Sequence, residues 1–327
     1  MTVIDTSTPA RERLVEGLLG WGGARPQAPA GLATRLLRAM EDDLSALQPQ
    51  LAALAEQRRG RRLLISKSTL DRLTCDGLQL APVPYEHTAA NVRGVLAHAA
   101  IAADWERSRS EDPVALVDTV WHEHATRRPG DPSSLSAWLN ARARDEAAAL
   151  RGDIAHLVEA FREVWPPLPS RLVRVVVERP VEIRLAGGAV VLRGVPDLVI
   201  ESRREDDRAR ALVVDLKTGR PRSEHDRHEL RFYALLHTLR TGRPPFRWAT
   251  FYVTEGRGEP EELREETLAL TARRVVDIVS QITRLDGLAP DADEDGLHLA
   301  AGIGCYSCLR RPTCSVAARE LGSASDA

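Results

Sequence analysis

Hydrophobic positions recur at helical spacing through the first half of the chain. Apolar residues three and four apart between Leu32 and Gln57 predict two helices. A serine-rich capping signal predicts a short helix over residues 66–75. The same spacing predicts further helices, interrupted by prolines, at residues 88–105, 113–127 and 134–164.

Beyond Pro166-Pro167 the pattern changes to stretches rich in Val, Ile and Leu. Residues 172–185 and 189–200 flank Gly187-Gly188, which predicts strands joined by a hairpin. The rest of the chain predicts a buried strand, a helix, a strand and a long helix, at residues 211–216, 223–240, 247–254 and 262–285. We therefore predict an α/β fold in which helices precede a β-β-β-α-β-α core.

The composition is that of a globular protein with a substantial core, 327 residues long and 43% hydrophobic. The sequence has no apolar run of the roughly 18 residues that span a membrane, and Met1–Arg13 lacks a signal-peptide pattern. We expect a cytoplasmic protein with no membrane partner. Because the net charge is −2, any nucleic-acid contact must come from a local basic cleft.

Lysine is rare in this chain. Of 45 basic residues only Lys67 and Lys217 are lysine, and the rest are arginine. Arginine stays protonated and does not offer a compact point charge, so a retained lysine is a candidate for chemistry. Lys67 is a candidate for contact with DNA phosphate, or a chance survivor of the bias.

Two acidic residues end adjacent predicted strands, Asp197 after Pro196 and Asp215 two residues before Lys217. Alternate strand residues share a face, so Asp215 and Lys217 point the same way. With the backbone carbonyl of Leu216, the two carboxylates would form an oxygen site suited to Mg²⁺ or Mn²⁺, which binds a phosphate oxygen and lowers the pKa of a water. Lys217 would orient or deprotonate that water, or stabilise the phosphate. The alternative is an ordinary surface ion pair.

The order Pro196-Asp197, Asp215-Leu216-Lys217 and then a helix with Glu229 and Tyr233 resembles the PD-(D/E)XK nucleases, in particular the RecB-like group. The resemblance implies a restriction-endonuclease-like core and a catalytic role for these five polar side chains. The family motif Q-x-x-x-Y has Gln where this chain has Glu229, which puts a DNA contact of that residue in doubt. A core aromatic is the alternative for Tyr233.

The resemblance extends to an upstream histidine. The segment from Gly94 to His98 is similar to the family motif G-x-x-x-H, which implies that His98 completes the metal shell or places a phosphate. A structural histidine is the alternative. His122 and His124 are two positions apart and therefore point to different sides of a helix.

The chain has four cysteines, Cys75 and, near the C-terminus, Cys305, Cys308 and Cys314. The spacing C-x₂-C-x₅-C plus a distant partner is typical of a metal site, either Zn²⁺ or an iron–sulfur cluster. The pattern resembles Cas4 and AddB-like nucleases, which implies a [4Fe–4S] cluster. Residues 66–75 also resemble the short helix before the first cysteine of that group.

The resemblance covers about residues 64–317, and residues 1–60 match no family we can name. We expect a helical extension at 1–60, a helical region with the first cysteine and His98 at 61–165, the nuclease core at 166–290 and an iron–sulfur segment at 291–327.

The resemblance implies a metal-dependent deoxyribonuclease. We expect it to act on single-stranded DNA or free ends in DNA repair, CRISPR adaptation or antiviral defence. Candidate phosphate contacts are Lys67, Arg220, Arg222, Arg227 and Arg231. The alternatives are a DNA-binding scaffold for a helicase or effector partner and a zinc-stabilised restriction-like endonuclease. The sequence has no G-x-x-x-x-G-K-[ST] motif, so unwinding would need a partner.

Overall fold

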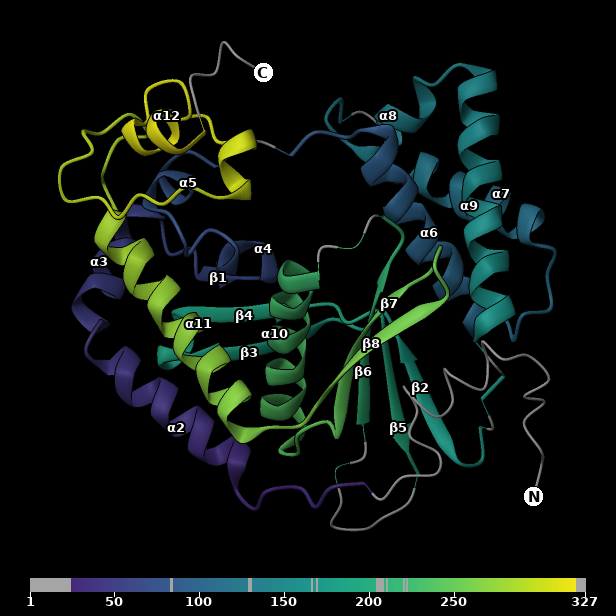
Figure 1. Cartoon of the computed structure of the whole chain (residues 1–327), viewed down its shortest axis with the longest axis horizontal. Helices are drawn as coiled ribbons and strands as arrows, with labels where there is room; N and C mark the ends of the chain where they lie inside the picture. The colour runs from purple at the N-terminus through teal and green to yellow at the C-terminus, as the bar shows by residue number, and fades with distance from the viewer. Residues whose placement is uncertain are drawn as a thin grey trace.

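A computed structural model describes residues 25–82, 85–128, 131–165, 167–168, 170–203, 209, 211–219, 221 and 223–321. The architecture is mixed α/β, with helices flanking two sheets, as the sequence predicts (Figure 1). In the described residues, no helix is both long enough and apolar enough to cross a membrane.

The larger sheet has the strand order β2-β5-β6-β7-β8. Strands β6 and β7 are parallel and the other neighbours are antiparallel. The central strand β6 is aliphatic on both faces, since Leu212 and Val214 belong to one hydrophobic core and Ala211 and Val213 to the other. The strands are β2 (Val173–Val177), β5 (Leu198–Ser202), β6 (Ala211–Lys217), β7 (Arg247–Tyr252) and β8 (Arg257–Glu262).

The smaller sheet has the order β1-β4-β3. It joins β1 (Leu63–Ile65), parallel to β4 (Val190–Gly194), and β3 (Val181–Leu185), antiparallel to β4. The predicted hairpin is confirmed, with its turn in the short 3₁₀ helix η2 (Ala186–Gly188), where Gly187 has a φ of 63°.

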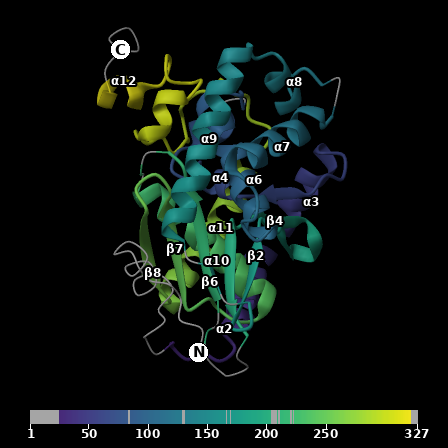
Figure 2. The same ribbon diagram turned by 90° about the vertical axis from the view of Figure 1, so that its right-hand side faces the viewer.

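One group of helices packs on one face of the larger sheet. It comprises α6 (Ala89–Glu106), α7 (Pro113–Thr126), α8 (Leu135–Asn140) and α9 (Arg144–Val164). Figure 2 shows these four helices gathered together. Their apolar faces meet alternate residues of β5, β6 and β7 in a single core.

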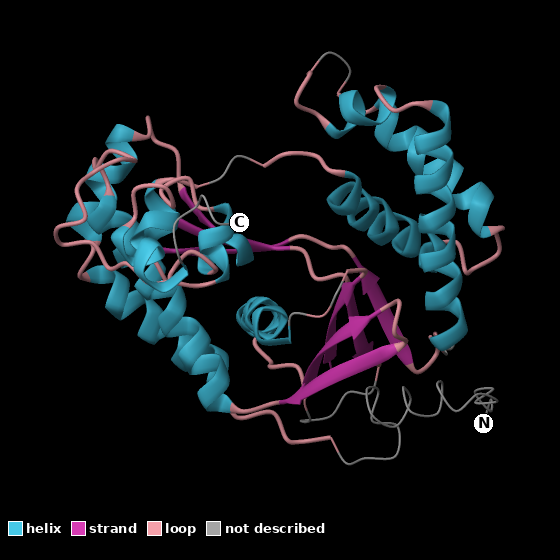
Figure 3. Ribbon diagram, turned by 45° about the horizontal axis from the view of Figure 1, so that its top comes forward, coloured by secondary structure: helices cyan, strands magenta, loops and turns pink. Residues whose placement is uncertain are grey.

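A second group of helices covers the opposite face. Helix α10 (Ser223–Thr241) contacts strands of both sheets and lies between them, and Figure 3 shows it across the larger sheet from the first group. Helices α2 (Leu32–Ser45), α3 (Gln48–Gln57) and α11 (Glu265–Leu285) pack outside α10. The remaining elements are the short helices α4 (Lys67–Leu70), α5 (Asp76–Leu80), η3 (Ile303–Ser307) and α12 (Ser315–Leu321).

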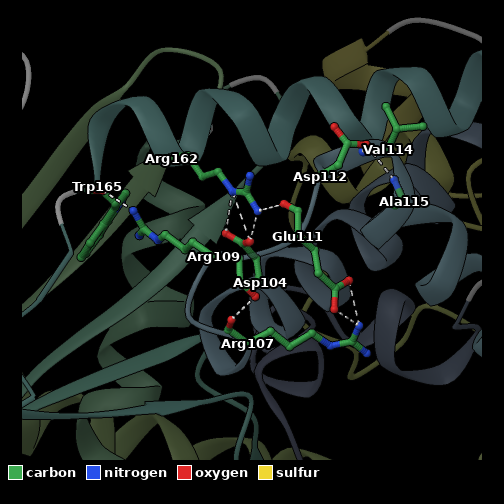
Figure 4. A network of polar contacts seen from close by, with 10 residues as sticks. Asp104, Arg107, Arg109, Glu111, Asp112, Val114, Ala115, Arg162 and Trp165 are labelled. Atoms are coloured by element: carbon green, nitrogen blue, oxygen red, sulfur yellow. Dashed lines mark hydrogen bonds and ion pairs between the residues drawn. The ribbon is translucent and has the colours of Figure 1, made fainter.

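A buried ion pair joins α6 to α9. Asp104 is 1% exposed, and Arg162 Nε donates to its Oδ2 over 3.1 Å. The same guanidinium donates to the carbonyl oxygen of Glu111 over 2.8 Å (Figure 4). Such a contact is costly to break, because a lone buried charge loses its solvation without compensation.

The structure corrects several predicted element boundaries. The stretches 172–185 and 189–200 each contain two strands, β2 with β3 and β4 with β5, and each pair is divided between the two sheets. The divisions fall at Pro180 and Pro196, which lack the N–H that a continuous ladder requires. The single helix predicted at 134–164 is two helices, and strand β8 was not predicted.

Candidate active site

Antiparallel pairing brings the predicted carboxylates together at one end of the larger sheet. Leu198 of β5 lies opposite Val214 of β6, so Asp197 and Asp215 are neighbours across the two strands. Both are buried, at 8% and 2% exposed. The two strands are adjacent, as predicted, but Asp197 directly precedes β5 and Asp215 lies inside β6, two residues before its end.

Asp197 is held by groups from two directions. Its Oδ1 lies 2.9 Å from His98 Nδ1 on α6, and its Oδ2 accepts from the backbone N–H of Leu216. Burial alone would lower the pKa of His98, but the Asp197 charge outweighs burial and raises it. In turn, the pKa of Asp197 is lowered despite its burial, because His98 and the Leu216 amide stabilise the carboxylate. The G-x-x-x-H histidine therefore reaches the site.

Glu178 is a site residue that the sequence reasoning missed. One ligand atom each from His98, Glu178 and Asp197 lies within 4.8 Å of the others. Glu178 follows β2 and has a left-handed φ of 42°, and its N–H donates to the Asp197 carbonyl over 3.0 Å. The one available signal was an acidic residue directly after a run of valines, on a strand that pairs with the Asp197 strand.

Asp215 carries a buried acceptor that other described groups do not satisfy. Lys217 Nζ forms an ion pair with Asp215 Oδ2 over 2.8 Å, and this buried oxygen has no hydrogen bond of regular geometry among the described residues. Burial and the nearby Asp197 charge raise the pKa of Asp215. A divalent cation would satisfy this oxygen and reduce the repulsion, so the carboxylates and His98 fit a metal ion.

Lys217 lies among carboxylates from β6 and α10. It forms an ion pair with Glu229 and lies 3.7 Å from Asp226 Oδ1. The hydroxyl of Tyr252 donates to Asp226 Oδ2 over 3.0 Å, which fixes the second carboxylate. Burial would lower the pKa of Lys217, but Asp215 and Glu229 outweigh it and raise the pKa. Asp215 and Lys217 thus share a face, as predicted.

Glu229 and Tyr233 occupy one face of α10, as their spacing predicts. Both are buried, at 8% and 4% exposed. The Tyr233 ring packs tightly over Gly194, where an added Cβ would lie 2.7 Å from Tyr233 Cε1. Burial, followed by the Asp215 and Asp197 charges, raises the pKa of the Tyr233 hydroxyl.

Lys67 also reaches this site, although it is 162 residues away from Glu229 in the chain. Its Nζ donates to Glu229 Oε2 over 3.3 Å, and the same oxygen accepts from Lys217. The Lys67 ammonium lies 5.6 Å from the centroid of the Tyr233 ring. Both lysines of the chain therefore meet at one carboxylate.

A cleft of about 1070 Å³ opens beside these residues. One wall comes from α6 and α7 and includes His98, His124 and Arg127. The other wall includes Lys67, Lys217 and the strand end at Glu178, together with Leu216, whose carbonyl was a predicted metal ligand. The buried carboxylates thus adjoin an open space that is lined by both lysines.

The candidate DNA-binding arginines that the structure describes lie away from this cleft. Arg231 Nε donates to both carboxylate oxygens of Glu261 on β8, over 2.9 and 3.1 Å, and Arg227 lies 3.9 Å from Glu259. Neither residue lines the cleft. Arg220 and Arg222 lie outside the described residues.

The four cysteines belong to segments that pack together. Cys75 directly precedes α5, Cys305 lies in η3 and Cys314 precedes α12. All four are free thiols, and burial raises the pKa of Cys308, as do the nearby thiols of the other three.

A polar contact ties these segments together beside Cys75. Buried Asp76 accepts from Arg284 over 2.7 Å, from Gln281 over 2.8 Å and from the His298 amide over 2.7 Å. These contacts outweigh burial and lower the pKa of Asp76. The distant cysteine and the C-terminal three thus share one region, as their spacing suggested.

Comparison with known proteins adds the family. No curated protein matches the chain. Among solved structures the chain is similar to the crystal structure of SSO0001, with 16% identity over 83% of this chain and 96% of that one and a TM-score of 0.31. A family model described as the PD-(D/E)XK nuclease superfamily matches residues 73–315, which include Asp197, Asp215, Lys217 and all four cysteines. The chain therefore belongs to the PD-(D/E)XK nuclease superfamily, which indicates a metal-dependent nuclease acting on nucleic acid.

Proposed function

We propose that this protein is a deoxyribonuclease that hydrolyses phosphodiester bonds at the Asp197–Asp215–Lys217 site. The observation that carries the proposal is the unsatisfied, buried Asp215 Oδ2 beside a second buried carboxylate and a lysine. Such an arrangement is costly in a purely structural role, because buried like charges repel. It is well suited to a divalent cation and an anionic substrate.

The side chains divide into two sets. Asp197, Asp215, Glu178 and His98 would hold Mg²⁺ or Mn²⁺, with the Leu216 carbonyl as a further candidate ligand. When bound, the ion supplies positive charge that polarises the phosphate. Lys217 places an ammonium beside Asp215, where it stabilises charge on the phosphate and orients the attacking water. Glu229 holds Lys217 in place from α10.

We assign DNA with a single-stranded region or a free end as the substrate, and the RecB/Cas4-like branch as the closest functional class. The support is the motif order of G-x-x-x-H, Pro-Asp, D-x-K and the α10 tyrosine, together with His98 and Lys217, which line the cleft. End processing in repair, CRISPR adaptation or phage defence, with a helicase or effector partner, fits this assignment.

A substrate panel tests the proposal. Labelled single-stranded DNA, blunt duplex, overhang duplex and RNA are incubated with the purified protein in Mg²⁺, Mn²⁺ or EDTA. We expect metal-dependent degradation of DNA, fastest on strands with a free single-stranded end. A protein that binds DNA but leaves all substrates intact in every metal is a scaffold, and the proposal is then wrong.

We also propose that the four cysteines bind a [4Fe–4S] cluster that clasps the ends of the nuclease region. Four thiolates suit either an iron–sulfur cluster or Zn²⁺, and the resemblance of the cysteine pattern to that of Cas4 and AddB-like nucleases favours the cluster. Anaerobically purified protein should be brown and contain iron and acid-labile sulfide. A colourless protein with one zinc per chain would instead support the zinc-stabilised endonuclease.

A further inference from the structure

We propose that Lys67 forms a second phosphate-binding subsite of the active site, charge-balanced by Glu229. The ligand is a phosphodiester group of the bound strand. The proposal rests on the nuclease function above and adds a residue that lies outside the span matched by the family model. Three observations on Lys67 and its surroundings carry it.

The first observation is convergence. Lys67 begins α4 and Lys217 ends β6, yet both ammonium groups contact Glu229 Oε2. In a chain whose other 43 basic residues are arginine, both lysines lie at one site. An ammonium is a small, freely oriented donor, whereas a guanidinium requires a planar arrangement.

The second observation is access. The Lys67 side chain is 37% exposed and lines the cleft, whereas that of Glu229 is 8% exposed. Glu229 therefore supports Lys67 from its buried side, and the partly exposed Lys67 side chain faces the cleft. The Tyr233 ring, 5.6 Å from Nζ, gives a second support that does not use up a hydrogen-bond donor.

The third observation is charge. Five carboxylates lie at the site, and the two lysines neutralise the charge of only two of them. The five are Glu178, Asp197, Asp215, Asp226 and Glu229. With His98 as a neutral metal ligand, one divalent ion brings the sum over these carboxylates and lysines to −1, and Glu106, Glu123 and Arg127 on the cleft walls add a further −1. Loss of Lys67 makes the site more negative by one charge, which increases the repulsion of a phosphodiester. Lys67 thus permits an anionic strand to approach a site that must also be acidic enough to hold metal.

Removing Glu229 charge should therefore compensate for removing Lys67 charge. Lys67→Met should weaken binding of single-stranded DNA about tenfold, and adding Glu229→Gln in the same chain should restore most of that affinity. Glu229→Gln alone should tighten binding but slow cleavage, because Lys217 loses a contact that orients it. Lys67→Arg keeps the charge but loses the compact donor, so its affinity should lie between that of Lys67→Met and that of wild type.

The test measures binding of fluorescent single-stranded DNA with Ca²⁺ in place of Mn²⁺, across a salt series, together with thermal unfolding of each variant. A lost phosphate contact should make the slope of log K against log salt shallower by about 0.7 in Lys67→Met. The matched control is Arg35→Met, which removes an exposed cation that pairs with Glu265 over 2.7 Å outside the cleft. It should leave affinity and salt slope unchanged.

Unchanged affinity and slope in Lys67→Met would overturn the subsite. So would an affinity loss that tracks a lowered unfolding temperature and is not restored by Glu229→Gln, since that is the behaviour of a structural lysine. The readouts are binding and salt dependence. A wild-type protein that cleaves nothing therefore refutes the proposed nuclease function, while the subsite is judged on its own data.

Discussion

The Lys217→Arg variant keeps the positive charge of the active-site lysine but changes the position of that charge. Lys217 Nζ sits 2.8 Å from Asp215 Oδ2 and 3.7 Å from Asp226 Oδ1 and also pairs with Glu229, so three carboxylates define its place. Its side chain is only 20% exposed, which leaves little room for a guanidinium. Arginine would keep the charge near phosphate but displace it from the attacking water.

We expect Lys217→Arg to bind DNA and Mn²⁺ within a few-fold of wild type and to cleave about 100-fold more slowly. That rate loss corresponds to about 2.7 kcal/mol of transition-state stabilisation. Single-turnover degradation of labelled single-stranded DNA measures the chemical step, and fluorescence titration measures binding. Wild-type rates in the arginine variant would refute the positional role of the lysine.

Three further variants test other parts of the structure. Asp104→Ala should lower the free energy of unfolding, measured by urea titration, by about 3 kcal/mol, because it leaves the charge of Arg162 without its buried partner. The control Asp118→Ala removes one partner of an exposed ion pair and should lower that free energy by under about 1 kcal/mol. Burial lowers the pKa of His237 from 6.5 to about 4, so the contribution of His237 to stability, fully present above pH 6.5, should be lost by about 3 kcal/mol as the pH drops to 4. His237→Leu should reduce the slope of unfolding free energy against pH by that contribution. Cys75→Ser should remove the brown colour and lower stability more than it changes the cleavage rate of the folded fraction; a fully stable variant that cannot cleave would place the cysteine site in DNA handling instead.

The carboxylates and Lys217 could be predicted because their relation is local. Asp215 and Lys217 alternate on one strand, and strand pairing needs only adjacency to bring Asp197 beside them. The helices were predictable from apolar spacing, as in α2, α6 and α11, whose buried residues repeat every three or four positions.

Other features depend on tertiary structure that no local pattern encodes. Lys67 reaches Glu229 across 162 residues, and its place at the active site follows from how α4 packs against α10. Glu178 was missed because its backbone leaves the strand with a positive φ. Strand β8 contains Pro260 and charged residues, a pattern that indicates a loop unless a neighbouring strand is present to pair with it.

The most direct test of the central claim is single-turnover cleavage of labelled single-stranded DNA in Mn²⁺ by wild type, Asp215→Ala and the control Asp118→Ala. Asp215 has a buried oxygen without a hydrogen-bond partner among the described residues, whereas Asp118 pairs with Arg151 on an exposed helix surface. The account predicts cleavage by wild type and by Asp118→Ala, and none by folded Asp215→Ala. Wild-type cleavage by Asp215→Ala would contradict it.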